Sequence, residues 1–398
     1  IKWLNETNMN EVDIVGGKNA SLGTMMQNLK ALKIKIPNGF VITTNTYDKF
    51  IKYNNISDKI ASIMKDLDIN KNLKETGIQI RELILNGKFP KNIIDDIYKY
   101  YNELSKEYNS DKIDVAVRSS GSAEDMPDAS FAGQQDTFLN VTGKENVLNY
   151  TKKCFASLFN DRAISYRKTM NYDKIDYKLS VTIQKMVRSD LGSAGVAFSL
   201  DINSGFRDII VVNSSFGLGE IVVSGNVLPD EFIISKKCIQ NNYSSIISKK
   251  MGHKNEKIVF DIENGGVKYE PLVNYDKNNF SLDEDNIILL SKWILRIEDL
   301  YSNIYKRDCP MDIEWGFDGN DLYILQARPE TVYSRKENNK FTQYKTKKLN
   351  NKILASGTAI GDSIGIGYVK NFDTIDQVTN DNFKKGDVLV TDITDPDW

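Results

Sequence analysis

The sequence predicts a mixed α/β or α+β fold, because strand-like and helix-like patterns alternate along it without a regular order. Its 398 residues are enough for about two or three domains and a sizeable core. Hydrophobic residues make up 40% and charged residues 27%, which is the composition of a soluble globular protein. The formal net charge of -2 creates no overall field that attracts nucleic acid or an anionic membrane, so we expect neither as a partner.

Apolar runs in the sequence are shorter than a membrane span, and "IKWLNETNMNEVD" at the start lacks the pattern of a signal peptide. The first residue is not Met, so we expect the start to have been processed or trimmed. Cys154, Cys238 and Cys309 are scattered and form neither a zinc spacing nor a disulfide framework, which indicates a reducing cytoplasm. A multi-histidine metal site is excluded because His253 is the single histidine.

The first half of the sequence predicts mostly helices around two strands. Apolar residues at helical spacing predict a helix that opens just after Gly16 and Gly17. "IPNGFVITTNTYDKFI" predicts a turn, a short strand and a helix, and residues 57–107 carry a charged helical pattern. "DVAVRSS" (114–120) predicts a strand that runs into the small-residue loop "GSAEDMPDASFAGQQD". Residues 145–170 predict one amphipathic helix.

The second half predicts several strands before a polar connection. "LSVTIQKMV", "GSAGVAFSL" and "DIIVVNSSFGLGE" are strand-like, residues 284–306 are helical, and residues 311–331 form a hairpin, "MDIEWGFDGNDLYILQARPET". Residues 334–348 are polar and basic and are predicted to be a linker. Residues 349–398 are short β segments punctuated by glycine, and we expect them to begin a further β-rich domain that this chain does not complete.

The hairpin carries polar residues where a sheet usually takes apolar ones. Asp312 and Glu314 share one face of their strand, and Gln326 and Arg328 share one face of theirs. A two-residue Asp-Gly loop would turn the two pairs to opposite faces, whereas a three-residue loop with Gly319 at positive φ would bring all four together. The opposite, buried face would then consist of Ile313, Trp315, Tyr323, Leu325 and Ala327. Four such polar residues indicate a metal–phosphate floor, and the alternative is a solvent-facing hairpin with ordinary salt bridges.

Three further segments have residue types that suit a nucleotide. A glycine pair before Lys18 at a helix start favours an anion, although the P-loop spacing is absent and a plain turn is the alternative. Arg118 precedes a loop whose uncovered amides suit a phosphate, and the alternative is a structural ion pair beside a disordered loop. Gln184 ends a strand against which a base could lie, as it could in any core strand. His253 lies between lysines and is predicted to be a surface residue.

Taken together, the segments resemble the phosphoenolpyruvate synthase (pyruvate, water dikinase) family, in that family's order. The resemblance is carried by "VGGKNASLG", "IPNGF", "VAVRSSGSAEDMPDASFAGQQDTFLNV", "FASLFNDRAISYR", "MVRSDLGSAGVAFSLD", "MDIEW", "QARPETV" and "GDVLVTDITDPDW". It implies an ATP-grasp-like, two-lobed nucleotide-binding domain over residues 1–333 and the start of a swivelling phosphohistidine domain over residues 349–398. It also implies a cytoplasmic enzyme of gluconeogenesis that converts pyruvate, ATP and water to phosphoenolpyruvate, AMP and phosphate.

By motif, the resemblance assigns nucleotide-binding roles to a set of eight residues. They are Lys18, Arg118, Gly133, Thr137, Gln184, Glu314, Gln326 and Arg328. Lys18 and Arg118 would hold the phosphates of ATP, Gly133 and Thr137 would belong to the loop that covers them, and Gln184 would lie at the adenine end. Lys18 and Arg118 are therefore catalytic candidates.

The resemblance further implies that Mg²⁺ accompanies ATP. Glu314 and Gln326 would bind the metal, and Asp312 would support them. Arg328 would contact the phosphates that are transferred, and is the third catalytic candidate. The polar face of the hairpin would then be the metal–phosphate floor.

The sequence departs from the family at its end. The family's phosphoacceptor histidine lies in a "GGRTCHAA"-like motif after "TDPDW", and this chain contains neither that motif nor a pyruvate domain. We therefore expect a fragment that holds the ATP site, whose full-length protein would take pyruvate and could form a homodimer. A rifamycin-type antibiotic phosphotransferase and a non-catalytic nucleotide-binding module are the alternatives, and "TDITDPDW" and "EDMPDASFAGQQ" favour the synthase.

Overall fold

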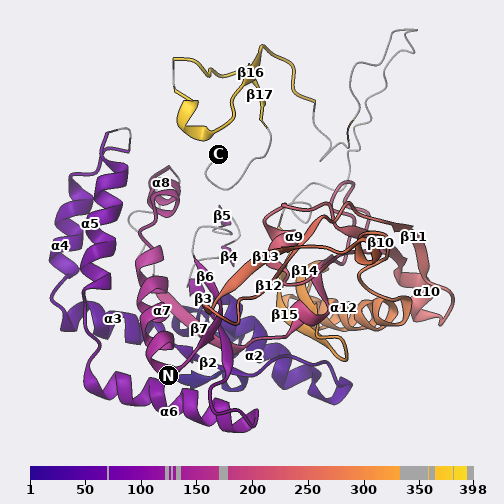
Figure 1. Cartoon of the computed structure of the whole chain (residues 1–398), viewed down its shortest axis with the longest axis horizontal. Helices are drawn as coiled ribbons and strands as arrows, with labels where there is room; N and C mark the ends of the chain where they lie inside the picture. The colour runs from indigo at the N-terminus through magenta and orange to yellow at the C-terminus, as the bar shows by residue number, and fades with distance from the viewer. Residues whose placement is uncertain are drawn as a thin grey trace.

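Two antiparallel sheets form the framework of the chain, and helix α2 (Gly17–Leu29) contacts strands of both (Figure 1). The mixed α/β architecture that the sequence predicts is confirmed. The structure is a computed structural model. It describes residues 1–69, 71–121, 125–126, 129–130, 136–169, 178–331, 357, 364–379 and 381–391.

The first sheet has five strands within the described residues, in the order β1-β2-β7-β3-β6, and each neighbouring pair is antiparallel. Its strands are β1 (Lys2–Trp3), β2 (Gly39–Ile42), β3 (Asp114–Gly121), β6 (Thr137–Thr142) and β7 (Leu179–Lys185). Because side chains alternate along a strand, Val117 and Ile183 enter one core while Arg118 and Thr182 point to the opposite face.

Helices lie on the apolar side of the first sheet in two layers (Figure 1). α3 (Thr44–Tyr53), α6 (Lys91–Glu107) and α7 (Lys144–Ser157) contact its strands. α5 (Leu73–Leu85) packs on α7, and α4 (Ser57–Lys65) and α8 (Asp161–Thr169) pack on α5. The helical pattern predicted for residues 57–107 is confirmed by α4, α5 and α6. Aromatic rings such as Phe50 and Phe155 are fully buried between these helices and the sheet.

The single helix predicted for residues 145–170 is wrong, because α7 ends at Ser157 and α8 begins at Asp161. Arg81 Nη1 donates to the Phe159 carbonyl (2.7 Å) and to the Asp161 carboxylate (2.9 Å). A continuous helix would use that carbonyl as an acceptor for its own backbone, so this contact with α5 holds the break in place.

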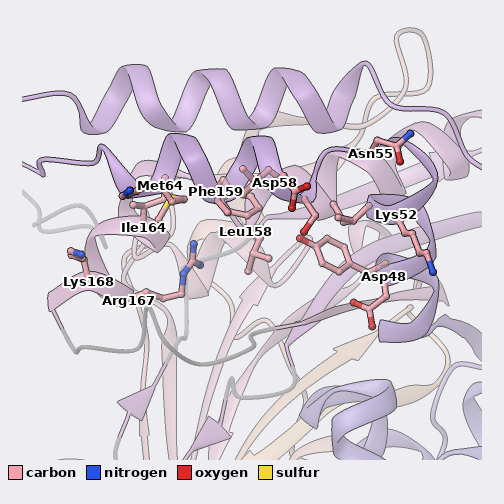
Figure 2. A pocket seen from close by; sticks show the side chains of 16 residues that line it. Asp48, Lys52, Asn55, Asp58, Met64, Leu158, Phe159, Ile164, Arg167 and Lys168 are labelled. Carbon is pink, nitrogen blue, oxygen red and sulfur yellow. The ribbon is translucent and has the colours of Figure 1, made fainter.

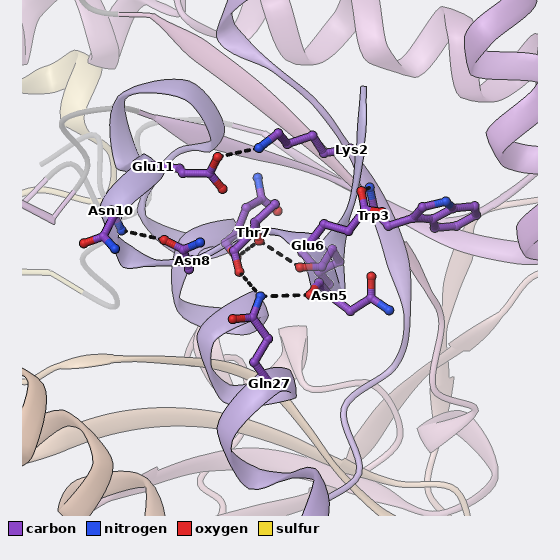
Figure 3. Close-up of polar contacts among 11 residues, drawn as sticks. Lys2, Trp3, Asn5, Glu6, Thr7, Asn8, Asn10, Glu11 and Gln27 are labelled. Atoms are coloured by element: carbon purple, nitrogen blue, oxygen red, sulfur yellow. Dashed lines mark hydrogen bonds and ion pairs between the residues drawn. The ribbon is translucent and has the colours of Figure 1, made fainter.

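Helix α2 lies on the polar face of the first sheet and is held by hydrogen bonds of its side chains. Asn19 accepts a hydrogen bond from Thr182 Oγ1 (2.6 Å) in β7 and donates to the Val15 carbonyl (2.7 Å). Near the end of α2, Gln27 Nε2 donates to the Asn5 and Thr7 carbonyls (2.9 and 3.0 Å; Figure 3). These contacts leave α2 little freedom to shift or rotate relative to the first sheet.

The second sheet has six strands within the described residues, in the order β11-β10-β9-β8-β14-β15, and all neighbouring pairs are antiparallel. Its strands are β8 (Ser193–Phe198), β9 (Ile209–Phe216), β10 (Asp230–Ser235), β11 (Ile246–Lys250), β14 (Met311–Phe317) and β15 (Leu322–Pro329). Helix α12 (Glu284–Tyr305) and α2 bury their apolar residues against this sheet, in a second core. The predicted strands β8 and β9, helix α12 and hairpin are confirmed.

The remaining elements are small. They are α1 (Val12–Val15), α9 (Glu220–Val223), α10 (Lys236–Gln240), α11 (Asn274–Lys277), the antiparallel pairs β4 (Asp125–Met126) with β5 (Ala129–Ser130) and β12 (Glu256–Phe260) with β13 (Val267–Pro271), and the parallel pair β16 (Val369–Asn371) with β17 (Val388–Val390). Among the described residues, none of the helices combines the length and the apolar character that crossing a membrane requires.

Candidate functional site

The polar face predicted for the hairpin is present. Asp312 pairs with Arg328 and Glu314 pairs with Gln326 across β14 and β15, so all four side chains share one face. The three-residue loop expected to produce this arrangement is wrong, because the turn has four residues, 318–321.

A β-bulge compensates for the longer turn. Phe317 pairs with Leu322, and this register alone would send the two polar pairs to opposite faces. The extra residue Leu325 in β15 shifts the register by one and brings the pairs together. The buried side of the hairpin therefore consists of Ile313, Trp315, Leu322, Ile324 and Ala327. Tyr323 and Leu325, which were expected on that side, are only half-buried.

Arg118 connects the first sheet to this polar face. Its Nη2 atom donates to Glu314 Oε2 (2.7 Å) and to Gln326 Oε1 (3.0 Å), and its Nη1 atom donates to the Leu325 carbonyl (3.4 Å). The bulge matters here, because it places the Leu325 carbonyl where Arg118 reaches it. Arg118 Nε is buried and has no hydrogen-bond partner within the described part of the chain. The Arg118 guanidinium thus joins the two sheets, and its Nε–H group is left to bind a further acceptor.

Arg328 lies beside this contact on the same hairpin face. Its Nε and Nη2 atoms are 3.0 and 2.9 Å from Asp312 Oδ2. The Arg328 side chain is 31% exposed, about twice the 15% of Arg118. Arg328 is therefore the guanidinium that a solvent-borne anion reaches more easily.

Lys18 approaches from the first turn of α2. Its Nζ atom donates to the Ser119 carbonyl (3.2 Å), which is adjacent to Arg118 in β3. Gly16 precedes the helix with φ of 78°, and a Cβ atom there would lie 2.4 Å from the Ser120 carbonyl oxygen. Only glycine permits this close approach, so the glycine pair places the helix start and Lys18 against the end of β3.

The two acidic residues have opposite pKa shifts. Burial works to raise the pKa of Glu314, but the Arg118 guanidinium, together with Lys18 and Arg328, outweighs it and holds the pKa below the usual range. Burial raises the pKa of Asp312, and its ion pair with Arg328 offsets this only in part. Of the two carboxyl groups, Glu314 therefore ionises at the lower pH, and it is the better candidate to bind a cation.

The donor set fits Mg²⁺. Magnesium prefers oxygen ligands and usually takes one or two carboxylates together with substrate phosphates. Glu314 Oε2 and Gln326 Oε1 converge on the same Arg118 nitrogen, so two oxygen donors already meet around one positive group. One carboxylate and one amide oxygen leave most positions of an octahedral ion to water and to substrate phosphates, so these two donors suit a metal that binds together with a phosphate.

The structure brings the other candidates to different places. Thr137 is exposed and lies directly opposite Arg118 in the β3–β6 pair. Gln184 is buried, and its Nε2 atom donates to the Pro37 carbonyl (3.1 Å). Gly133 lies outside the described residues, so its assignment stays a prediction. His253 is exposed and lies 3.1 Å from Asn255 Nδ2, as predicted for a surface residue.

Sequence reasoning missed two backbone acceptors in the site, the carbonyls of Ser119 and Leu325. A carbonyl has no side-chain signature, so only the fold reveals its role. The Leu325 carbonyl reaches Arg118 because of the β-bulge, and the alternation of residues in the sequence does not predict a bulge.

A cavity of about 880 Å³ lies elsewhere, between α3, α4 and α8 (Figure 2). Its lining mixes apolar residues such as Met64 with charged ones such as Asp58 and Lys168. The residues that line it include none of the site candidates named above. Convergent charge and hydrogen bonding, rather than the size of a cavity, therefore identify the hairpin face as the candidate site.

Comparison with known proteins identifies the family of the chain. A family model described as pyruvate phosphate dikinase, AMP/ATP-binding domain, matches residues 12–348. This range contains Lys18, Arg118 and the whole hairpin.

Relatives of known name resemble the chain from end to end. It is 47% identical to a phosphoenolpyruvate synthase of Aquifex aeolicus over 406 residues, which cover 100% of this chain and 47% of the relative. It is 44% identical to the phosphoenolpyruvate synthases of Helicobacter pylori and Escherichia coli, and covers 50% of each. The chain thus spans about half the length of the curated relatives it matches.

Proposed function

The chain belongs to the family of pyruvate phosphate dikinase AMP/ATP-binding domains, and from this premise we propose that it binds ATP with Mg²⁺ on the polar hairpin face. The observation that carries the proposal is the position of Arg118. Its guanidinium contacts Glu314 and Gln326 and retains a buried Nε donor without a partner among the described residues. A phosphate oxygen is the acceptor that such a donor prefers.

Three cationic side chains would hold the phosphates. Lys18 lies at the start of α2, where the backbone N–H groups of the first turn and the helix dipole also favour an anion. Arg118 lies between the two sheets, and Arg328 lies on the more exposed part of the hairpin. We propose that Lys18 and Arg118 orient the phosphate chain and that Arg328 neutralises the charge that develops on the transferred phosphoryl group.

Glu314 and Gln326 would hold Mg²⁺, with Asp312 behind them. When bound, the metal would neutralise phosphate charge and fix the phosphate geometry. The low pKa of Glu314 keeps this ligand ionised at neutral pH. Arg328, paired with Asp312, keeps the second carboxylate in place.

For the intact protein, we propose phosphoenolpyruvate synthase activity. ATP and one water would give AMP, inorganic phosphate and a phosphorylated histidine outside this chain, and the histidine would pass its phosphoryl group to pyruvate to give phosphoenolpyruvate. An ATP-grasp-like domain over residues 1–333, a linker over 334–348 and a swivelling domain from residue 349 are parts of the same proposal, as is a cytoplasmic role in gluconeogenesis. The names of the relatives support this function over an antibiotic phosphotransferase or a non-catalytic module.

Isothermal titration calorimetry of the chain with ATP, with and without Mg²⁺, tests the binding proposal. Arg118→Gln should weaken Mg-ATP binding about 10- to 150-fold, because a hydrogen bond to a charged group contributes about 1.5–3 kcal/mol. Arg81→Gln is the matched control, since Arg81 also contacts one carboxylate and one backbone carbonyl but lies among the helices. A wild-type chain that binds no ATP at millimolar nucleotide would disprove the proposal.

A further inference from the structure

A buried pair of hydroxyl groups connects α2, α12 and β15 beside the proposed site. Ser21 Oγ lies 2.5 Å from Tyr301 Oη and donates to the Ala327 carbonyl (2.6 Å). Tyr301 Oη also lies 3.1 Å from the Ser21 carbonyl. Ser21 is 5% exposed and Tyr301 is fully buried. None of the roles proposed above uses either residue.

The hydrogen bonds of the pair connect the three elements. A serine and a tyrosine hydroxyl each have a single proton. Ser21 Oγ donates to the Ala327 carbonyl, and the Tyr301 hydroxyl donates to Ser21, at its Oγ atom or at its carbonyl oxygen. Either way the Tyr301 proton goes to Ser21, so the contacts run from α12 through α2 to β15.

The carbonyl that accepts from Ser21 belongs to an edge strand. β15 is the last strand of the six-stranded sheet, so its outward backbone groups need partners other than a further strand. Ser21 supplies one such partner for Ala327, and the Lys35 carbonyl supplies another for the Ile324 N–H (2.9 Å). Apolar packing between α2 and the sheet has no direction, whereas these bonds fix where the strand lies along the helix.

The proposed site depends on the position of β15 along α2. Ser21 lies three residues after Lys18 in α2, which places both on neighbouring positions of the helix surface. Ala327 lies between Gln326 and Arg328 in β15. The hydroxyl pair thus sets the spacing between Lys18 in α2 and the residues Gln326 and Arg328 in β15.

We infer that Tyr301 and Ser21 are positioning residues for the triphosphate of ATP. The inference rests on the proposed function, because it concerns the geometry of the same site. A triphosphate has to reach from Lys18 to Arg328, so its binding depends on their spacing. AMP, with a single phosphate, depends on it much less.

Titration of ATP and AMP into Tyr301→Phe tests the inference. We expect ATP binding to weaken about five- to tenfold and AMP binding to change less than twofold, since one hydrogen bond is lost. Tyr101→Phe is the matched control. Tyr101 is equally buried and donates to the Ile113 carbonyl (2.7 Å), but it lies at the first sheet, away from the hairpin. The Tyr101→Phe variant should have a lower free energy of unfolding than wild type but the same ratio of ATP to AMP affinity.

A second pair of variants covers the case in which Tyr301→Phe does not fold. Ser21→Ala should show the same selective loss of ATP affinity. Ser291→Ala should not, because Ser291 is a fully buried serine of α12 whose hydroxyl has no partner among the described residues. Equal losses of ATP and AMP affinity, or a selective loss in a control, would overturn the inference. A wild-type chain that binds neither nucleotide would overturn the proposed function and this inference with it.

Discussion

Arg118 Nη2 lies 2.7 Å from Glu314 Oε2, and this ion pair joins β3 of the five-stranded sheet to β14 of the six-stranded sheet. The same nitrogen donates to Gln326 Oε1 (3.0 Å). One guanidinium therefore donates hydrogen bonds to both of the oxygens that we propose as Mg²⁺ ligands. Its contacts have to rearrange when a metal and a phosphate take these positions, which couples the two sheets to the nucleotide.

The pH dependence of stability should differ between the two acidic residues of the hairpin. The pKa of Glu314 is lowered in the fold, so its contribution is present at neutral pH and is lost as the pH falls below about 4. The stability that wild type holds over Glu314→Gln should therefore shrink as the medium is acidified. Chemical denaturation at a series of pH values from about 3 to 7 measures this difference.

Asp312 should behave in the opposite way. Burial raises its pKa, so its contribution is complete at low pH and is lost as the pH rises through the folded-state pKa. The free energy of unfolding of wild type should therefore fall relative to that of Asp312→Asn as the pH rises above about 4. Identical slopes for Asp312→Asn and Glu314→Gln would contradict the different environments of the two carboxyl groups.

Arg328 should matter for turnover far more than for ATP affinity. An arginine that stabilises charge in a phosphoryl-transfer transition state contributes about 10³–10⁵ in rate. Arg328→Ala in the intact enzyme should therefore lower kcat by several orders of magnitude, while the Kd for ATP rises much less. Arg296→Ala is the control, because Arg296 is 61% exposed on α12 and its Nη1 atom lies 3.6 Å from Asp299 Oδ2. Near wild-type turnover of Arg328→Ala would remove Arg328 from the proposed mechanism.

The hairpin illustrates what a sequence reveals and what it does not. Alternation predicted that Asp312 shares a face with Glu314 and that Gln326 shares one with Arg328, and left open whether the two faces coincide. The structure brings the two pairs to one face. The turn length was wrong because a bulge at Leu325 changes the register without leaving a mark in the sequence. Two deviations from ideal pairing, a longer turn and a bulge, compensate for each other.

The contact of Arg118 with the hairpin could not be predicted from local patterns. Its partners follow it by about 200 positions along the chain, and they meet because α2 packs against both sheets. Strands β10 to β13 were also not predicted from the sequence. β11, for example, is an edge strand with mostly exposed side chains, so its sequence has no apolar alternation to detect.

A buried ion pair in the second sheet should control stability. Lys254 and Asp230 are both fully buried, and the Asp230 carboxylate also accepts hydrogen bonds from Gly252 N and Ser281 N (2.8 Å each). Lys254→Met removes one charge and leaves the other in the interior, which costs about 3–5 kcal/mol. Denaturant unfolding measures this loss. Lys237→Met, at an exposed pair with Asp208, should leave stability almost unchanged, and equal effects of the two variants would refute the interpretation.

Phosphohistidine should not form on this chain when it is incubated with labelled ATP. Its single histidine, His253, is exposed, bonds to Asn255 (3.1 Å) and pairs through its backbone with Leu228. Lys18 contacts the Ser119 carbonyl, Arg118 contacts Glu314, and Arg328 contacts Asp312. A phosphoryl acceptor has to reach within about 3.5 Å of the phosphorus in line with the bond that breaks, and a histidine fixed elsewhere cannot do so.

The measurement is incubation with γ-labelled and with β-labelled ATP, followed by a test for acid-labile label. We expect none, and His253→Asn should behave like wild type in ATP titrations. Acid-labile label that disappears in His253→Asn would show that the acceptor lies in this chain. It would also overturn our proposal that the receiving histidine belongs to a part of the protein outside residues 1–398.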